Sequence, residues 1–141
     1  MKPETHLFLF GDQTYDFVPD LRRLLSCRSK PILNAFLEQS YYVIRAQSNL
    51  WLSSAGRPAS QTSSLAQLLH KYCEGSLSPA FQVSLHALTQ LGSSICHYEE
   101  LGQVYPSPGS TYLVGLCTGS LAAAAISSSS SEPMVFHTAI R

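Results

Sequence analysis

Apolar residues recur every three to four positions through the middle of the chain, which is the period of a helix with one buried face. The clearest stretch has apolar side chains at Leu65, Leu68, Leu69 and Tyr72. A second, longer stretch begins near Pro79 and continues to about Leu101. Taken together, the spacing predicts helices over residues 21–25, 32–46, 65–73 and 79–101.

Capping residues mark the expected ends of these helices. Asp20 can cap the first helix, and Ser63 or Ser64 can cap the third. Gly102 can close the fourth, because glycine accepts the left-handed conformation that often ends a helix. The polar stretch over residues 48–64 predicts a flexible connector. It does not predict a domain boundary, since neither flank is large enough to fold alone.

Two short apolar runs are typical of strands. The run from Leu7 to Phe10 stops at Gly11 and Asp12, as expected of a buried parallel strand. A second run, at residues 112–114, precedes a helix-forming stretch of small residues. This order predicts two parallel strands joined by a long, right-handed helical crossover. The turns that follow both strands would then lie at the same carboxyl edge of the sheet.

The turn after the second strand carries the strongest chemical signal in the chain, Gly115-Leu116-Cys117-Thr118-Gly119. A strand, a Gly-x-Cys-x-Gly turn and a helix form the layout of a nucleophile elbow, with cysteine where the better-known motif has serine. Gly115 and Gly119 fit because strand and helix approach closely at an elbow. The amide dipoles of the following helix favour a thiolate at Cys117. The alternative is a buried structural cysteine.

Acyl transfer would require two backbone N–H groups aimed at the developing oxyanion. At an elbow, the residue after the nucleophile supplies one of them, and here that residue is Thr118. A second N–H usually comes from a loop after a neighbouring strand, and the Gly11-Asp12-Gln13 turn is the candidate in this chain. The alternative for this turn is an ordinary end of a strand.

The overall composition excludes several classes of function. Apolar residues make up 45 % of the chain and charged residues 13 %, with nine basic and nine acidic side chains. A chain without net charge or a basic cluster offers no electrostatic case for binding nucleic acid or an anionic membrane. No apolar run approaches the roughly 20 residues of a membrane span. The four cysteines show no CxxC spacing, so we expect reduced thiols, no metal site and a cytoplasmic setting.

Two of these segments carry a family resemblance. Phe10-Gly11-Asp12-Gln13, followed about a hundred residues later by the Gly115–Gly119 motif, resembles the starter-unit acyl-carrier-protein transacylase domain of fungal non-reducing polyketide synthases. The resemblance extends from about His6 to about Ser129. More distantly, the chain is similar to malonyl-CoA:carrier-protein transacylases, which have serine at the elbow.

This resemblance implies an α/β fold, namely an incomplete α/β-hydrolase-like core with a small parallel sheet and a long helical crossover. It implies that Cys117 is the acyl-accepting nucleophile, and that Thr118 and Gln13 contribute oxyanion-hole amides. The implied substrates are acyl-CoA and the phosphopantetheine thiol of an acyl carrier protein, with no tightly bound cofactor.

The resemblance also leads us to expect that the catalytic base is absent from this chain. In the family that this chain resembles, the base is a histidine well downstream of the nucleophile, beyond the last residue here. His6 begins the first strand, at the end opposite the elbow. We expect His70, His86 and His97 to be surface or satisfied core groups, and His137 not to serve as the base. The chain is therefore expected to be a fragment with weak or no activity. Residues 1–131 would form the N-terminal part of a starter-unit acyltransferase domain, and residues 132–141 a divergent, poorly ordered tail. A cysteine-dependent thioesterase or hydrolase and a non-catalytic interaction module are the alternatives.

Overall fold

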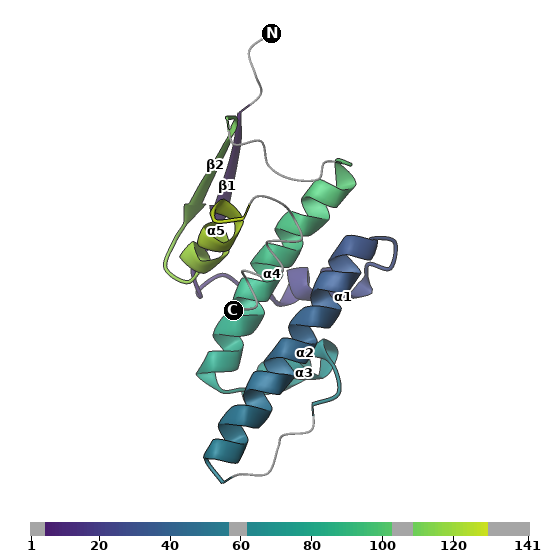
Figure 1. Ribbon diagram of the computed structural model, residues 1–141, viewed down its shortest axis with the longest axis vertical. Coiled ribbons are helices and arrows are strands. Elements are labelled where there is room, and N and C mark those ends of the chain that lie inside the picture. The colour runs from purple at the N-terminus through teal and green to yellow at the C-terminus, as the bar shows by residue number, and fades with distance from the viewer. Residues whose placement is uncertain (1–4, 57–61, 103–108, 130–141) are drawn as a thin grey trace.

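The structure, a computed structural model, describes residues 5–56, 62–102 and 109–129 of the 141-residue chain. It has a mixed α/β fold with a small parallel sheet beside a group of helices (Figure 1). The elements in chain order are β1 (His6–Phe10), α1 (Val18–Ser26), α2 (Pro31–Ser54), α3 (Leu65–Cys73), α4 (Pro79–Glu100), β2 (Thr111–Gly115) and α5 (Gly119–Ser127). The expected tail at 132–141, which contains His137, lies outside the described residues.

The predicted parallel pairing of the two strands is confirmed. β1 and β2 pair in register, with Phe8 opposite Leu113 and Phe10 opposite Gly115. The helices from α1 to α4 lie between them in the sequence and form the crossover. Past the paired residues, the Leu116 backbone N–H still donates to the Phe10 carbonyl oxygen at 2.9 Å, so the two chains stay together as they leave the sheet.

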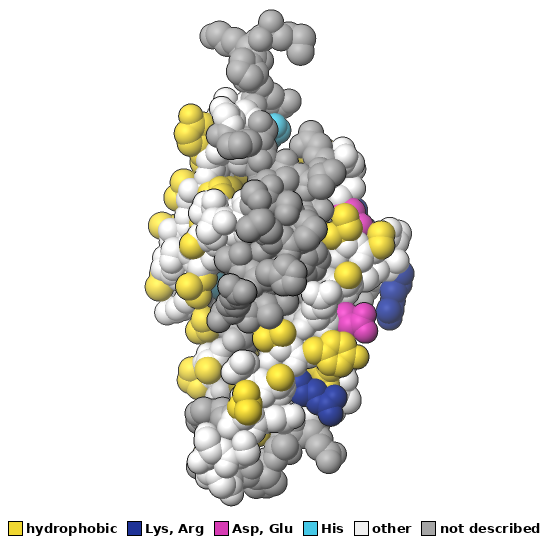
Figure 2. Space-filling model, viewed as in Figure 1, with side chains coloured by type: hydrophobic (Ala, Val, Ile, Leu, Met, Phe, Trp, Pro, Cys, Tyr) yellow, Lys and Arg dark blue, Asp and Glu magenta, His cyan; other side chains and the backbone are white. Residues whose placement is uncertain are grey.

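The expectation that the first strand is buried is wrong for one of its two faces. Phe8 points toward α4, where its ring packs against Tyr98, whereas Leu7 and Leu9 are 60 % and 72 % exposed. Successive side chains of a strand point to opposite faces, and the face that carries Phe8 packs against α4, while α5 contacts both strands. Apolar side chains therefore lie at the surface over the strands (Figure 2).

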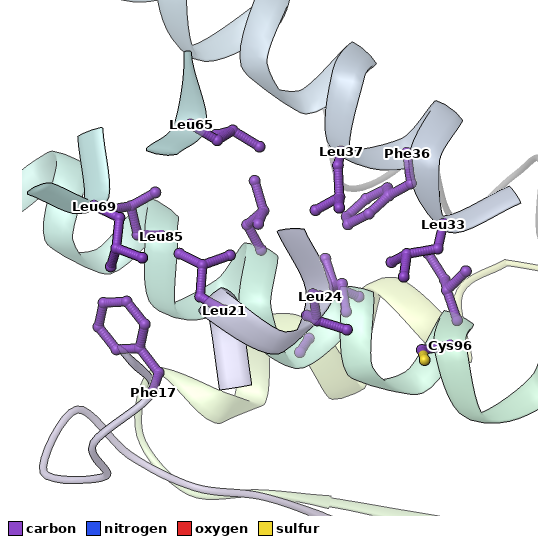
Figure 3. Close-up of a cluster of buried hydrophobic side chains, with 14 of the residues drawn as sticks. Phe17, Leu21, Leu24, Leu33, Phe36, Leu37, Leu65, Leu69, Leu85 and Cys96 are labelled. Carbon is purple, nitrogen blue, oxygen red and sulfur yellow. The ribbon is translucent and has the colours of Figure 1, made fainter. Parts of the chain in front are cut away.

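The hydrophobic core lies mainly between the helices, with α4 at its centre. Leucine and phenylalanine side chains from α1, α2, α3 and α4 converge there, as Figure 3 shows. The most completely buried of them are Leu21, Leu24, Leu33, Phe36 and Leu85. α4 also packs against α5, so one long helix touches both the helical core and the layer next to the sheet.

Most helix boundaries follow the predicted caps, and two do not. The predicted helix over 65–73 is confirmed, and the Ser64 hydroxyl accepts from the Gln67 N–H at 3.2 Å. Gly102 follows α4 with a φ of +62°. However, α1 begins at Val18, whose N–H donates to the Asp16 carboxylate at 3.1 Å, so Asp20 lies within the first turn. α2 continues to Ser54, since no glycine or proline interrupts it before Gly56.

A contact between distant segments holds the start of α2. The two carboxylate oxygens of Glu99, on α4, accept from the Ile32 and Leu33 backbone N–H groups at 3.0 and 3.1 Å. The first N–H groups of a helix have no partner within the helix, and they favour a negative charge. Glu99 therefore caps α2 and fixes it to α4. None of the described helices is long and apolar enough to span a bilayer.

Candidate functional site

The Gly115–Gly119 segment, called here the cysteine turn, leads directly from β2 into α5. Cys117 has a φ of +50° and is the one non-glycine residue with a positive φ in the described part of the chain. This left-handed conformation costs about 1–2 kcal/mol for a residue with a Cβ. The turn is closed by its own hydrogen bonds, with the Gly119 N–H donating to Leu116 O at 2.9 Å and the Ser120 N–H to Cys117 O at 3.0 Å.

Both glycines of the turn lie where a side chain has no room. A Cβ at Gly115 would approach the Ser120 Cα to 2.5 Å, which is closer than any ordinary contact. At Gly119, a Cβ would lie 2.5 Å from the Gly11 carbonyl oxygen and would also meet the Phe10 carbonyl. The start of α5 therefore rests directly on the backbone at the end of β1.

The loop that follows β1, residues Gly11–Tyr15, is the second part of the site and is called here the first-strand loop. The Asp12 carboxylate accepts from the Thr14 backbone N–H at 3.0 Å and from the Thr14 hydroxyl at 2.5 Å, and these bonds lower the pKa of Asp12. The Tyr15 hydroxyl donates to the carboxylate of Asp20 on α1, which raises the pKa of Tyr15. The loop is thus anchored both internally and to α1.

The structure brings the cysteine turn and the first-strand loop together. Cys117 Sγ lies 4.0 Å from the Gln13 side-chain Oε1, although the two residues are 104 positions apart in the sequence. Both side chains are exposed. The backbone N–H groups of Gln13 and Thr118 donate to no acceptor within the described residues. The sulfur therefore stands in solvent at the carboxyl edge of the sheet, beside two loops with uncommitted N–H groups.

The other cysteines have different surroundings. Cys96 is buried in α4, and burial together with the neighbouring Glu100 carboxylate raises the pKa of its thiol. Cys27 is half-buried, whereas Cys73 is exposed at the end of α3. The described residues contain no group of three or more side chains that could hold a metal ion. Exposure combined with a strained backbone distinguishes Cys117 from the other three.

No histidine among the described residues donates to or accepts from Cys117 Sγ. His70 is an exposed side chain that lies 3.3 Å from the Glu74 carboxylate, as expected of a surface group. His97 is exposed and packs its ring against Phe8 and Tyr98. His6 is half-buried at the start of β1, at the other end of the strand from Cys117.

His86 is the histidine that sequence reasoning placed wrongly. It is only 2 % exposed, so it is not a surface group, and its Nε2 has no partner in the described part of the chain, so it is not a satisfied core group. Its Nδ1 lies 3.3 Å from the Thr118 hydroxyl, beneath the cysteine turn. Burial lowers the pKa of His86, while the backbone carbonyl and the carboxylate of Asp12 oppose this shift.

Gln90 also contributes to the site without having been foreseen. It lies one helical turn after His86 on α4 and donates from Nε2 to the Gly11 carbonyl at 2.7 Å. A signal for both residues is present in the sequence, since a histidine and a glutamine four positions apart border the apolar stripe of that helix. Polar residues next to a buried stripe often contact something specific, because an unpaired polar group is costly to bury.

The fold and site define a mixed α/β protein that presents an exposed cysteine at a strand-to-helix turn. The family model "Starter unit:ACP transacylase in aflatoxin biosynthesis" matches residues 8–140. The chain therefore belongs to this family, which confirms the resemblance seen in the sequence. The matched range continues past Ser129, the residue near which the resemblance was expected to end.

Similar proteins are synthases from fungi. The chain is 52 % identical over 137 residues to the norsolorinic acid synthase of Dothistroma septosporum and 53 % identical over 137 residues to norsolorinic acid synthase stcA of Emericella nidulans. It is 40 % identical over 129 residues to the conidial yellow pigment biosynthesis polyketide synthase melA of Penicillium expansum. These alignments cover 97 %, 97 % and 92 % of the chain. The chain spans about 6 % of the length of these curated relatives.

Proposed function

We propose that this chain carries the acyl-accepting cysteine of a starter-unit transacylase, and that Cys117 is the nucleophile. The observation that carries the proposal is the position of Cys117. It is an exposed thiol in a left-handed turn between a parallel strand and a helix. Next to it lies a second loop, in which the Gln13 N–H donates to no described acceptor. Such a turn holds a side chain clear of the backbone, where an incoming thioester can reach it. We further propose that the small sheet is part of an α/β-hydrolase-like core.

The reaction would proceed in two steps, with acyl-CoA as donor and a carrier-protein thiol as acceptor. In the first, the Cys117 thiolate forms a bond to the carbonyl carbon of the thioester, and the carbonyl electron pair moves onto oxygen. The N–H groups of Thr118 and Gln13 would donate to this oxyanion. When the carbonyl re-forms, the bond to the CoA sulfur breaks, and CoA leaves as a thiolate that takes up a proton.

The second step repeats the same chemistry with the phosphopantetheine thiol of an acyl carrier protein as nucleophile. That thiol must lose its proton before it attacks the acyl-cysteine, and a general base normally accepts this proton. No described histidine contacts Cys117 Sγ. We therefore expect the chain to acylate slowly and to transfer the acyl group to a carrier protein poorly. The reaction needs no tightly bound cofactor, and we expect it to take place in the cytoplasm, where thiols stay reduced.

The test is intact-protein mass spectrometry of the chain after incubation with acetyl-CoA, hexanoyl-CoA or malonyl-CoA. We expect one acyl group per chain, lost on Cys117→Ala and retained on Cys73→Ala. Cys73 is the matched control because it is the other exposed cysteine. Acylation that persists in Cys117→Ala, or no acylation of the unmodified chain by any of the three donors, would contradict the proposal.

The exposure of Cys117 also favours a second candidate, a thioesterase or hydrolase in which water accepts the acyl group. In that case, free acid would accumulate from acyl-CoA in the absence of a carrier protein. Because no described histidine contacts Cys117 Sγ, a non-catalytic interaction module is a further alternative. For such a module, iodoacetamide should label Cys117 no faster than Cys27, Cys73 or Cys96.

A further inference from the structure

One face of α4 touches both halves of the candidate site. Gln90 donates to the Gly11 carbonyl at 2.7 Å, at the start of the first-strand loop. His86 lies 3.3 Å from the Thr118 hydroxyl, in the cysteine turn. Residues four apart on a helix lie on the same face, one turn from each other. α4 is a long straight helix that lies beside α5 (Figure 1), so the two contacts come from one rigid element.

His86 and Gln90 are both buried, and each buries a polar atom that has no hydrogen bond among the described residues. His86 is 2 % exposed and Gln90 is 8 % exposed. Each has one polar atom, His86 Nε2 and Gln90 Oε1, without a partner among the described residues. Burying a polar atom without a hydrogen bond is unfavourable, because the atom gives up its bonds to water. Apolar residues at these positions would avoid that cost, so a purely structural role would favour leucine or phenylalanine.

We propose that His86 and Gln90 are positioning residues that set the relative placement of the two N–H groups in the oxyanion site. The inference rests on the proposed function. Thr118 would supply one N–H and is itself the residue whose side chain meets His86. Gln13 would supply the other and lies two residues after Gly11, the residue that Gln90 holds. A common anchor on α4 keeps these two groups at a fixed separation.

A fixed separation matters because an oxyanion site acts through geometry. Loss of one donor from such a site lowers the rate by about 100–1,000-fold, and a displacement of about 1 Å can cost about 100-fold. Gly119, which rests on the carbonyls of Phe10 and Gly11, sets the distance between the two backbones. This contact lies one residue from Thr118 and two residues from Gln13, so it does not by itself orient their N–H groups. The α4 contacts add constraints on both loops, from Gln90 to the Gly11 carbonyl and from His86 to the Thr118 hydroxyl.

The test compares two reactions of the same sulfur in the 141-residue chain. Acylation by acetyl-CoA or hexanoyl-CoA passes through an oxyanion, whereas alkylation by iodoacetamide displaces iodide and does not. The variants are His86→Phe and Gln90→Met, which remove the polar contacts but keep similar volume. We expect each to slow single-turnover acylation of Cys117 by about 10- to 100-fold, less than the full loss of a donor. Alkylation should stay within about twofold, since it needs no such donor.

Two further variants separate positioning from a general loss of structure. His86→Asn places an amide close to where Nδ1 lies, so it should restore most of the acylation rate that His86→Phe loses. His97→Phe changes an exposed histidine of the same helix and should alter neither reaction. Equal acylation rates in the unmodified chain and in His86→Phe and Gln90→Met would overturn the inference. A parallel fall in acylation and alkylation would overturn it too, because the substitutions would then act on the reactivity of the Cys117 sulfur and not on the oxyanion donors.

Hydrogen exchange provides a readout that does not depend on activity. The Tyr15, Gly119 and Ser120 amides are hydrogen-bonded inside the two loops. We expect faster exchange at Gly119 and Ser120 in His86→Phe, and at Tyr15 in Gln90→Met. If the unmodified chain takes no acyl group, the proposed function is wrong, and exchange alone decides whether α4 orders the loops. Unchanged exchange in both variants would then refute that role.

Discussion

The left-handed backbone at Cys117 predicts an unusual response to substitution. Almost everywhere in a folded protein, replacing alanine by glycine lowers stability. At residue 117, the φ of +50° reverses the expectation, since glycine adopts this conformation without steric cost. We therefore expect Cys117→Gly to be more stable than Cys117→Ala. Both variants lose the same exposed thiol, so the comparison isolates the backbone.

The size of the effect follows from two opposing contributions. A residue with a Cβ is destabilised by about 1–2 kcal/mol in the left-handed region, whereas glycine costs about 0.4–1 kcal/mol through the larger entropy of the unfolded chain. The difference favours Cys117→Gly over Cys117→Ala by about 1 kcal/mol. With a urea slope of about 2 kcal/mol per molar, the unfolding midpoint should rise by about 0.5 M. Circular dichroism during urea unfolding measures it directly.

An exposed helical position provides the matched control. Ala35 lies on the surface of α2, where Ala35→Gly should lower the free energy of unfolding by about 1 kcal/mol. The same alanine-to-glycine change thus has opposite signs at residues 117 and 35. A midpoint for Cys117→Gly at or below that of Cys117→Ala would refute the left-handed turn, and with it the geometric basis of the proposed nucleophile.

Three further predictions concern the contacts around the site. Gly119→Ala should lower the free energy of unfolding by about 1–3 kcal/mol in the same urea assay, because the added Cβ meets backbone at the end of β1. Gly109→Ala is the control: its Cβ meets nothing within 4 Å, so the free energy of unfolding should change by less than about 0.5 kcal/mol. Glu99→Ala should lower the free energy of unfolding by about 1–2 kcal/mol, because α2 loses its cap. Glu38→Ala, at an exposed position of α2, should leave the free energy of unfolding almost unchanged, and equal effects of the two substitutions would disprove the cap. Stability should fall as the pH drops below about 6.5, since the unfolded chain takes up a proton at the usual histidine pKa of 6.5 before buried His86 does. Above that pH the contribution of His86 to stability is constant, so His86→Phe should flatten the pH dependence below 6.5, as measured by thermal melts.

The sequence predicted the features that depend on neighbouring residues. Ser64 and Gly102 mark the ends of α3 and α4 because caps act within one helical turn. The parallel pairing of β1 and β2 was predicted as well, since a long crossover leaves few other arrangements. The meeting of the Gln13 and Cys117 loops followed from that topology. These inferences needed only local chemistry and a general rule of chain connectivity.

The features that the sequence did not reveal depend on distant segments. An apolar run such as Leu7–Phe10 is compatible with burial on one face or on both, and only the surrounding elements decide between them. The end of α2 was placed too early because a serine-rich stretch resembles a connector, although it continues a helix when its buried face has something to contact. His86 was misjudged because its position beneath Thr118 depends on how α4 and α5 pack.

The strain at Cys117 and the stability of the site are physically linked. The left-handed turn persists because Gly115 and Gly119 let α5 rest on the end of β1, and the same contact brings the first-strand loop beside the sulfur. Cys117→Gly should therefore be more stable than Cys117→Ala and have no thiol to acylate. Gly119→Ala should instead lower both the stability of the fold and the rate of Cys117 acylation. A residue whose backbone is strained, yet held in place by several independent contacts, is a candidate for a chemical role, and Cys117 meets this description.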